Sequence, residues 1–344
     1  MSGRAPVLVV GGAGYVGSHA ARALARDGRV VVVLDDLSTG HREFVKWGEL
    51  IVGADDDEDL VRATCRRHAI GAVLHFAART RVEESITDPA GYRRANVEAT
   101  GRLVRAVRAE GVRAFVFSSS AAVYGTPDRV PIPEDHPQRP TSPYGETKAE
   151  AEALLAASGL AVASLRYFNA AGAAWRDGLG EIHDPETHVI PLALEAAMTG
   201  STFTVFGEDW NTPDGTCVRD YVHVEDLAVA HVAALARLEA GGASCAWNLG
   251  TGSGCSVNEV LGVVERVVGR AIVRRRGLRR AGDPSLLIAD PSRARRDLGW
   301  APTASSIDRI VADAWAFRGL RRGRGDRGPG AAAPPPPGGP PCAT

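Results

Sequence analysis

The sequence lacks the marks of several protein classes. None of its five cysteines forms a CxxC pair, so we expect reduced thiols and no metal centre. No apolar run reaches the length of a membrane span, and the chain enters a strand near its start without the apolar core of a signal peptide. The formal net charge of −1 gives no reason to expect a nucleic-acid or membrane partner. These absences predict a cytoplasmic protein.

The length of 344 residues allows two domains, or one large domain with an appendage. From about Arg318 the sequence is rich in Gly, Pro and Arg and has no hydrophobic periodicity. Such a segment has almost nothing to bury, so we predict that residues 319–344 form a disordered tail.

Short apolar runs alternate with helical stretches through the first half of the chain, among them PVLVV, RVVVVLDD, GAVLHFAA and RAFVFSSS. Strands that are apolar throughout suit a parallel sheet covered on both faces. We therefore predict a doubly wound parallel α/β sheet of the Rossmann type over residues 1–168. After Asn169 the alternation breaks, which indicates a smaller mixed α/β substrate-binding lobe over 169–318. Some of its segments return to the sheet, and ASCAWNLGTG is predicted to be a further buried strand.

A glycine-rich stretch, VVGGAGYVGSH, joins the first strand to the first helix. Gly11 permits a tight turn, Gly14 lets the backbone approach a pyrophosphate, and Gly17 lets the helix pack closely on the sheet. The following helix offers free N–H groups and a positive dipole end to phosphates. The pattern predicts dinucleotide binding.

Two aspartates end the second strand, in VVLDD. Asp35 lies where a carboxylate would accept hydrogen bonds from the adenine ribose and repel a 2′-phosphate, which favours NAD over NADP. Asp36 follows, where an NADP enzyme would carry a cation. The alternative is that both residues only open a turn.

The stretch TSPYGETK contains a tyrosine and a lysine at helical spacing. Ser142 is a good N-cap and Pro143 a good first helical residue, so Tyr144 and Lys148 fall on one helix face. The ammonium should stabilise the phenolate and lower the tyrosine pKa from about 10, which would let the phenol exchange a proton with a sugar hydroxyl. This spacing also occurs by chance on many helices.

A serine cluster, Ser118, Ser119 and Ser120, ends the strand in FVFSSSAAVYG. Ligands of open α/β sheets bind at this edge, so one hydroxyl could hydrogen-bond the reacting oxygen. The order of glycine loop, acidic strand end, serine cluster and YxxxK is much more specific than any one of these signals.

In that order the motifs resemble the extended short-chain dehydrogenase/reductase family and, within it, the UDP-glucose 4-epimerases. The resemblance covers about Val7 to Trp315 and includes LRYFNAAGA, HDPETHVIPL, VFGEDW and DGTCVRDYVHVEDLA. It implies an isomerase that interconverts UDP-glucose and UDP-galactose through a 4-keto intermediate, with transient hydride transfer to bound NAD. It also implies a homodimer.

The resemblance assigns roles to individual residues. Tyr144 is the implied acid/base, Lys148 its orienting cation and Ser120 the substrate-hydroxyl partner. The implied cofactor contacts are Gly11, Gly14, Tyr15, Val16, Gly17, Asp35, Asp36, Asp55, Phe76, Ala77, Ala78, Asn96, Tyr144, Lys148 and Phe168. The implied substrate contacts are Ser120, Tyr144, Asn169, His188, Val205, Phe206, Arg219, Arg280 and Asp283. For Arg219 the alternative is an ion pair with Asp220 or a nearby acid.

The sequence departs from the family pattern at Ala54, Thr80, Ala95 and Ala122. A family lysine is replaced by Thr80, with arginines beside it, and a family aspartate by Ala54, whose role Asp55 would take by a one-residue shift.

Three alternatives remain at this level. An epimerase for an N-acetylated, uronic or pentose UDP-sugar is the nearest, although the bulky Leu286 favours glucose and galactose. A 4,6-dehydratase would need acids near Ser120, where the chain has Ala121 and Ala122. A non-catalytic dinucleotide sensor would typically have lost Tyr144 or Lys148.

Overall fold

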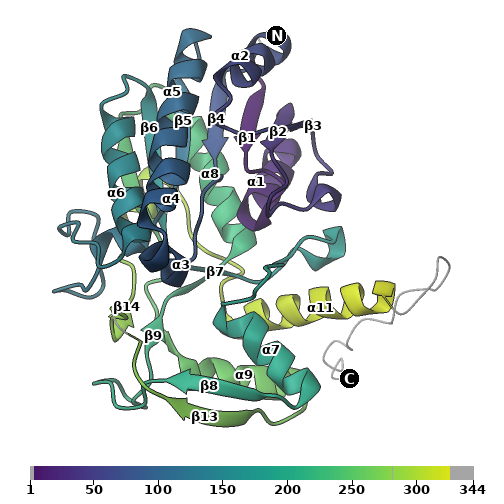
Figure 1. Cartoon of the computed structure of the whole chain (residues 1–344), viewed down its shortest axis with the longest axis vertical. Helices are drawn as coiled ribbons and strands as arrows, with labels where there is room; N and C mark the ends of the chain where they lie inside the picture. Colours follow the sequence, from purple (N-terminus) through teal and green to yellow (C-terminus); the bar gives the residue numbers. More distant parts are fainter. Residues whose placement is uncertain (1–3, 281, 326–344) are drawn as a thin grey trace, which may run out of the picture.

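The computed structural model describes residues 4–280 and 282–325, and its largest element is a parallel sheet of seven strands. The strand order is β11-β6-β5-β4-β1-β2-β3. Figure 1 shows the strands from β6 to β3 side by side in this order. These strands are β1 (Val7–Val10), β2 (Val31–Asp35), β3 (Glu49–Val52), β4 (Ala72–His75), β5 (Ala114–Ser120), β6 (Ala161–Tyr167) and β11 (Cys245–Leu249). The winding direction reverses between β1 and β4. The predicted doubly wound parallel sheet is confirmed, including its late strand around Trp247.

Helices cover both faces of this sheet, as the uniformly apolar strands predict. Alternate residues of each strand face opposite layers, so Val7 and Val9 pack with one set of helices while Leu8 and Val10 pack with the other. The first layer contains α1 (Tyr15–Arg26) and α8 (Val224–Glu239). The second contains α2 (Glu58–His68), α5 (Ala99–Ala109) and α6 (Pro143–Ala156).

A smaller lobe lies beyond the carboxyl edge of the sheet, in the lower part of Figure 1. Its apolar core joins α7 (Val189–Thr199), α9 (Val257–Val268) and α11 (Ile307–Gly325) with β8 (Thr202–Phe206). β8 pairs in parallel with β13 (Val273–Gly277). The other short strands are β7 (Asn169–Ala171), β9 (Val218–Arg219), β10 (Tyr221–His223), β12 (Cys255–Ser256) and β14 (Leu286–Leu287).

Short helices complete the connections. They are α3 (Val82–Thr87), α4 (Pro89–Arg93), α10 (Ser292–Leu298), the 3-10 turns η1 (Arg42–Phe44), η3 (Ala121–Tyr124) and η4 (Trp175–Asp177), and the π-helical η2 (Arg94–Glu98). No helix among the described residues is long and apolar enough to cross a membrane.

The last helix corrects the predicted start of the tail. α11 continues to Gly325, so residues 319–325 are helical rather than disordered. Composition alone could not show that the arginines of this segment have partners: Arg321 pairs with Glu43, and Arg322 pairs with Glu195. The rest of the predicted tail, 326–344, lies outside the described residues.

Candidate active site

A cleft of about 1800 Å³ lies between the carboxyl edge of the sheet and the lobe. It brings together segments that are far apart in the sequence, from the glycine loop after β1 to the lobe residues around Asp283. The predicted site residues that line it are Gly11, Gly14, Tyr15, Val16, Gly17, Asp35, Asp36, Asp55, Phe76, Ala77, Ala78, Ser120, Tyr144, Lys148, Phe168, Asn169, His188, Phe206, Arg219, Arg280 and Asp283.

The glycine loop packs so tightly that side chains are excluded at two positions. Gly11 has a φ of +77°, and a Cβ there would lie 2.5 Å from the backbone nitrogen of Ala77. A Cβ on Gly17 would overlap the carbonyl oxygen of Gly11. At Gly14, the N-cap of α1, the nearest such atom is 3.4 Å away. This open backbone at a helix N-terminus fits the pyrophosphate of a dinucleotide.

Asp35 shapes the turn after β2 and also lines the cleft. Its carboxylate accepts hydrogen bonds from the backbone nitrogens of Ala13 and Leu37, each at 2.9 Å, so it does shape the turn. It also lines the cleft, and burial raises its pKa despite those bonds. Asp36 is exposed and accepts hydrogen bonds from both the backbone and the hydroxyl of Ser38.

The α6 helix begins as predicted and presents Tyr144 and Lys148 to the cleft. Ser142 caps it by accepting a hydrogen bond from the Gly145 nitrogen, and Pro143 is its first residue. The Lys148 ammonium is only 3% exposed and donates to the carbonyl oxygen of Ser118 at 2.9 Å. Burial lowers its pKa to about 8.

The environment of Tyr144 corrects one expectation. Burial raises the pKa of its phenol, and the group that opposes this is Ser120, through a hydrogen bond, rather than Lys148. The lysine nitrogen lies 6.0 Å from the tyrosine ring centroid and is aimed at a strand carbonyl. The helical spacing therefore predicted that Tyr144 and Lys148 both reach the cleft. It did not predict that Ser120, rather than Lys148, would lower the pKa of the phenol.

The two arginines predicted for the substrate end lie near acids. Arg219 lies 3.7 Å from Asp283, and Arg280 lies 3.3 Å from Glu83. The alternative partner Asp220 is not used, because its carboxylate accepts backbone hydrogen bonds from residues 251, 252 and 289 instead. The guanidinium of Arg280 also stacks 4.1 Å from the Phe206 ring centroid.

Sequence similarity to known proteins identifies the family of this chain. The model of the NAD dependent epimerase/dehydratase family matches residues 7–250. The chain belongs to this family. The UDP-glucose 4-epimerase of Rhizobium meliloti (strain 1021) is 48% identical over 92% of this chain and 97% of its own length.

Solved structures of similar chains agree with this family membership. The UDP-glucose 4-epimerase from Brucella ovis in complex with NAD has a TM-score of 0.88 and 47% identity, covering 91% of this chain and 98% of that one. The UDP-Glc/GlcNAc 4-epimerase from Campylobacter jejuni has a TM-score of 0.80 and 35% identity, covering 91% and 99%.

Two predicted contacts of this epimerase/dehydratase family member are absent from the cleft lining. Asn96 is buried in the π-helical η2. Its side-chain amide accepts a hydrogen bond from the Arg79 nitrogen and donates to the Arg79 carbonyl oxygen and the Thr147 hydroxyl. Val205 is fully buried in the core of the lobe. Asn96 thus braces the loop after β4 against α6, and the side chain of Val205 supports β8.

The structure also locates the residues at which the sequence departs from the family pattern. Asp55 lines the cleft and lies 3.2 Å from the buried His75 imidazole. Thr80 lines the cleft as well, while the neighbouring Arg79 pairs with Glu84 and Asp88.

Leu287, rather than Leu286, lines the cleft, because adjacent residues of strand β14 point to opposite faces. The size argument based on Leu286 is therefore wrong.

A buried ionic network behind α6 was not predicted. Glu152 lies one turn beyond Lys148 on α6. Its carboxylate accepts a hydrogen bond from Ser119 Oγ at 2.5 Å and two from the Arg166 guanidinium at 2.9 and 2.6 Å. It thereby ties α6 to the ends of β5 and β6. The signal in the sequence is the i+4 spacing of Glu152 after Lys148.

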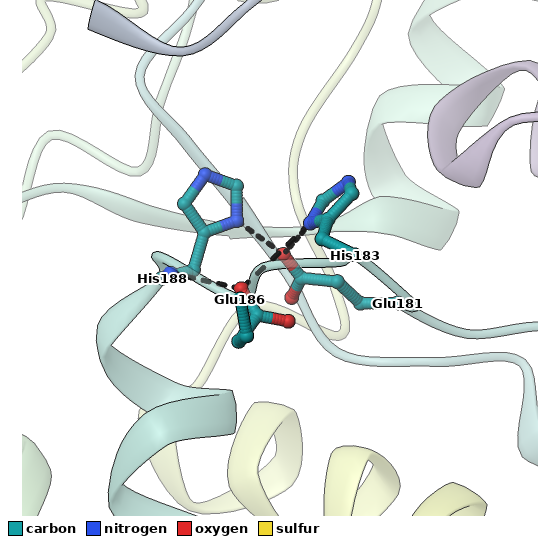
Figure 2. Close-up of side chains that lie close together, drawn as sticks. All are labelled: Glu181, His183, Glu186 and His188. Carbon is teal, nitrogen blue, oxygen red and sulfur yellow. Dashed lines mark hydrogen bonds and ion pairs between the residues drawn. The ribbon is translucent and has the colours of Figure 1, made fainter. Parts of the chain in front are cut away.

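A second unpredicted group contains Glu181, His183, Glu186 and His188, all in the segment before α7 (Figure 2). Both imidazoles point their Nδ1 atoms at Glu181 Oε1, and the His183 ring lies edge-on to Tyr15 in the glycine loop. The ion pair holds the pKa of Glu181 down to about 2. The sequence had indicated only His188, as a substrate contact.

Proposed function

We propose that this chain is a UDP-glucose 4-epimerase that uses NAD. The observation that carries the proposal is that Tyr144, Ser120 and Lys148 line one cleft together with the glycine loop and Asp35. The names of the relatives from Rhizobium meliloti and Brucella ovis support the same activity.

The residues around the glycine loop suit NAD. The backbone at Gly14 and the N-terminus of α1 would hold the pyrophosphate, and Asp35 would receive the adenine ribose hydroxyls and repel a 2′-phosphate. NAD, when bound, supplies the acceptor and donor of the C4 hydride.

Tyr144 would remove the proton from the sugar 4-hydroxyl and later return it. Ser120 stabilises the phenolate through its hydrogen bond and so offsets part of the burial penalty on that form. Lys148 supplies a buried positive charge on the same helix face, and the Ser118 carbonyl holds its ammonium in place.

The lobe would hold the nucleotide part of the substrate. Arg219 and Arg280 place planar guanidinium groups on the cleft, and such groups pair with diphosphates in a bidentate manner. In this proposal the diphosphate replaces Glu83 as the partner of Arg280, while Asp283, beside Arg219, stays a substrate contact.

A second candidate is a 4-epimerase with a broader substrate range that includes UDP-N-acetylglucosamine. The observation that favours it is the likeness to the Campylobacter jejuni enzyme, whose name includes both Glc and GlcNAc.

The test is to incubate the purified chain, without added NAD, with UDP-glucose and UDP-N-acetylglucosamine in turn. Chromatography of the products should show UDP-galactose from the first. The Tyr144→Phe variant should lose this activity by a factor of about 10²–10⁴, the usual contribution of a positioned acid/base, while it keeps bound NAD. Undiminished turnover by the variant would contradict the assignment.

We also propose a cytoplasmic homodimer. This rests on the family resemblance and the cysteine pattern, and light scattering of the purified protein tests the dimer.

A further inference from the structure

The cluster Glu181, His183, Glu186 and His188 has the composition of a transition-metal site. Each residue offers one ligand atom to a common point, and these atoms all lie within 4.8 Å of one another. Two imidazole nitrogens and two carboxylate oxygens suit Zn²⁺ and similar first-row ions, whereas Mg²⁺ and Ca²⁺ prefer oxygen ligands.

Two of the separations suit a tetrahedral ion, whereas His188 Nδ1 and Glu181 Oε1 are in direct contact and would have to move apart. Ligands at about 2.0–2.2 Å from Zn²⁺ are about 3.3–3.6 Å apart in a tetrahedron. His183 Nδ1 lies 3.2 Å from Glu181 Oε1 and 3.7 Å from Glu186 Oε1. The two imidazole rings stand nearly perpendicular, at 84°, so their Nδ1 atoms approach the carboxylates from different directions (Figure 2).

Local structure holds the ligands in place. Glu186 Oε1 accepts backbone hydrogen bonds from Thr187 at 2.8 Å and His188 at 2.9 Å, which fixes the turn just before α7. His188 is the N-cap residue of that helix, and the His183 ring contacts Tyr15. Binding of one ion by all four side chains then requires the His188 ring to move away from Glu181.

The two glutamates of the cluster are shielded from solvent, and the two histidines are more exposed. The side chain of Glu181 is 7% exposed and that of Glu186 is 15% exposed, while His183 and His188 are 35% and 54% exposed. Glu181, His183 and His188 line the cleft, so an ion can reach the group from solvent.

We propose that Glu181, His183, Glu186 and His188 form a binding site for one Zn²⁺ ion in the cleft. The ion would bind both Nδ1 atoms and both carboxylates, so that the two acids have a positive partner. The expectation of no metal centre was based on the spacing of the cysteines. The segment that forms the cluster, EIHDPETH, contains no cysteine, so that expectation did not cover it.

The test is direct metal binding to the full chain without an affinity tag. After dialysis against a chelator and then buffer, Zn²⁺ is titrated by calorimetry, and bound metal is counted by mass spectrometry after gel filtration. One ion per chain is expected, and Co²⁺ in its place should give the intense visible absorption of a four-coordinate complex. Mg²⁺ at the same concentration should not bind.

Variants identify the site. His183→Gln and Glu186→Gln should each weaken Zn²⁺ binding by at least about 100-fold, the upper end of the effect of losing an outer-shell partner. The matched control is His68→Gln, which removes an imidazole that also lies near a carboxylate, Glu49, but outside the cluster. It should leave the affinity unchanged.

Two results would overturn the proposal. The first is a wild-type chain that binds no stoichiometric Zn²⁺. The second is a His183→Gln/Glu186→Gln double variant, with wild-type circular dichroism, that binds Zn²⁺ as tightly as the wild type. In that case the ion would lie elsewhere, for example on the thiols.

Discussion

Replacing Lys148 with methionine should make the protein more stable and inactive. The ammonium is almost fully buried, and burial lowers its pKa from 10.5 to about 8. At about 1.36 kcal/mol per pKa unit, the shift means that burying this charge destabilises the folded state by roughly 3 kcal/mol at neutral pH. In the variant, loss of the hydrogen bond to Ser118 offsets about 1 kcal/mol of the gain. The expected net gain for Lys148→Met is therefore about 2 kcal/mol.

The pH dependence of this gain has a definite sign. Below pH 8 the lysine is protonated in both the folded and the unfolded state, so the penalty is fully present. Between pH 8 and 10.5 the folded state loses its proton first, and the penalty disappears. Stability gained by Lys148→Met should thus be largest near pH 7 and fall steadily toward pH 10.5.

Urea denaturation of wild type and variant at pH 7, 8.5 and 10 measures the difference. Both proteins need the same nucleotide content, checked by absorbance, because a bound cofactor would contact the same lysine. Destabilisation of the variant at pH 7, or a gain that grows with pH, would refute the reasoning.

Two other substitutions test neighbouring parts of the site. Asp35→Ala should weaken NAD binding and relax discrimination against NADP, and titration with each nucleotide checks this; an unchanged ratio of affinities would remove the ribose role. Glu152→Ala should destabilise the protein by about 3–5 kcal/mol in urea denaturation, because Arg166 is left as an unpaired buried charge. Glu152→Gln, which keeps a hydrogen-bond acceptor, should cost less, and equal losses would show that charge pairing is not the cause.

Local patterns predicted the parts of the site that one short segment determines. The glycine loop, the start of α6 at Pro143 and the approach of Tyr144 to the cleft all follow from residues within a few positions of one another. The parallel sheet followed from uniformly apolar runs, because only a sheet covered on both faces buries every strand residue.

Features that depend on tertiary neighbours could not be read in this way. The direction of the Tyr144 pKa shift depends on burial of the phenol and on where the Lys148 ammonium points. Asn96 turns inward because η2 is a π-helical segment, which no sequence period revealed. The arginines at the helical end of α11 lie near Glu43 and Glu195, which are distant in sequence.

The central sheet is completed late in the chain. β11 (Cys245–Leu249) pairs with β6, and α8 packs beside α1 on the same face, although both follow much of the lobe in sequence. A fragment that ends at residue 168 would leave the edge of β6 without its neighbour and one face of the sheet half covered. Exposed edges of this kind promote aggregation. During synthesis, the amino-terminal half must therefore wait for most of the chain before it can close its core, which makes this protein a poor source of a separable nucleotide-binding module.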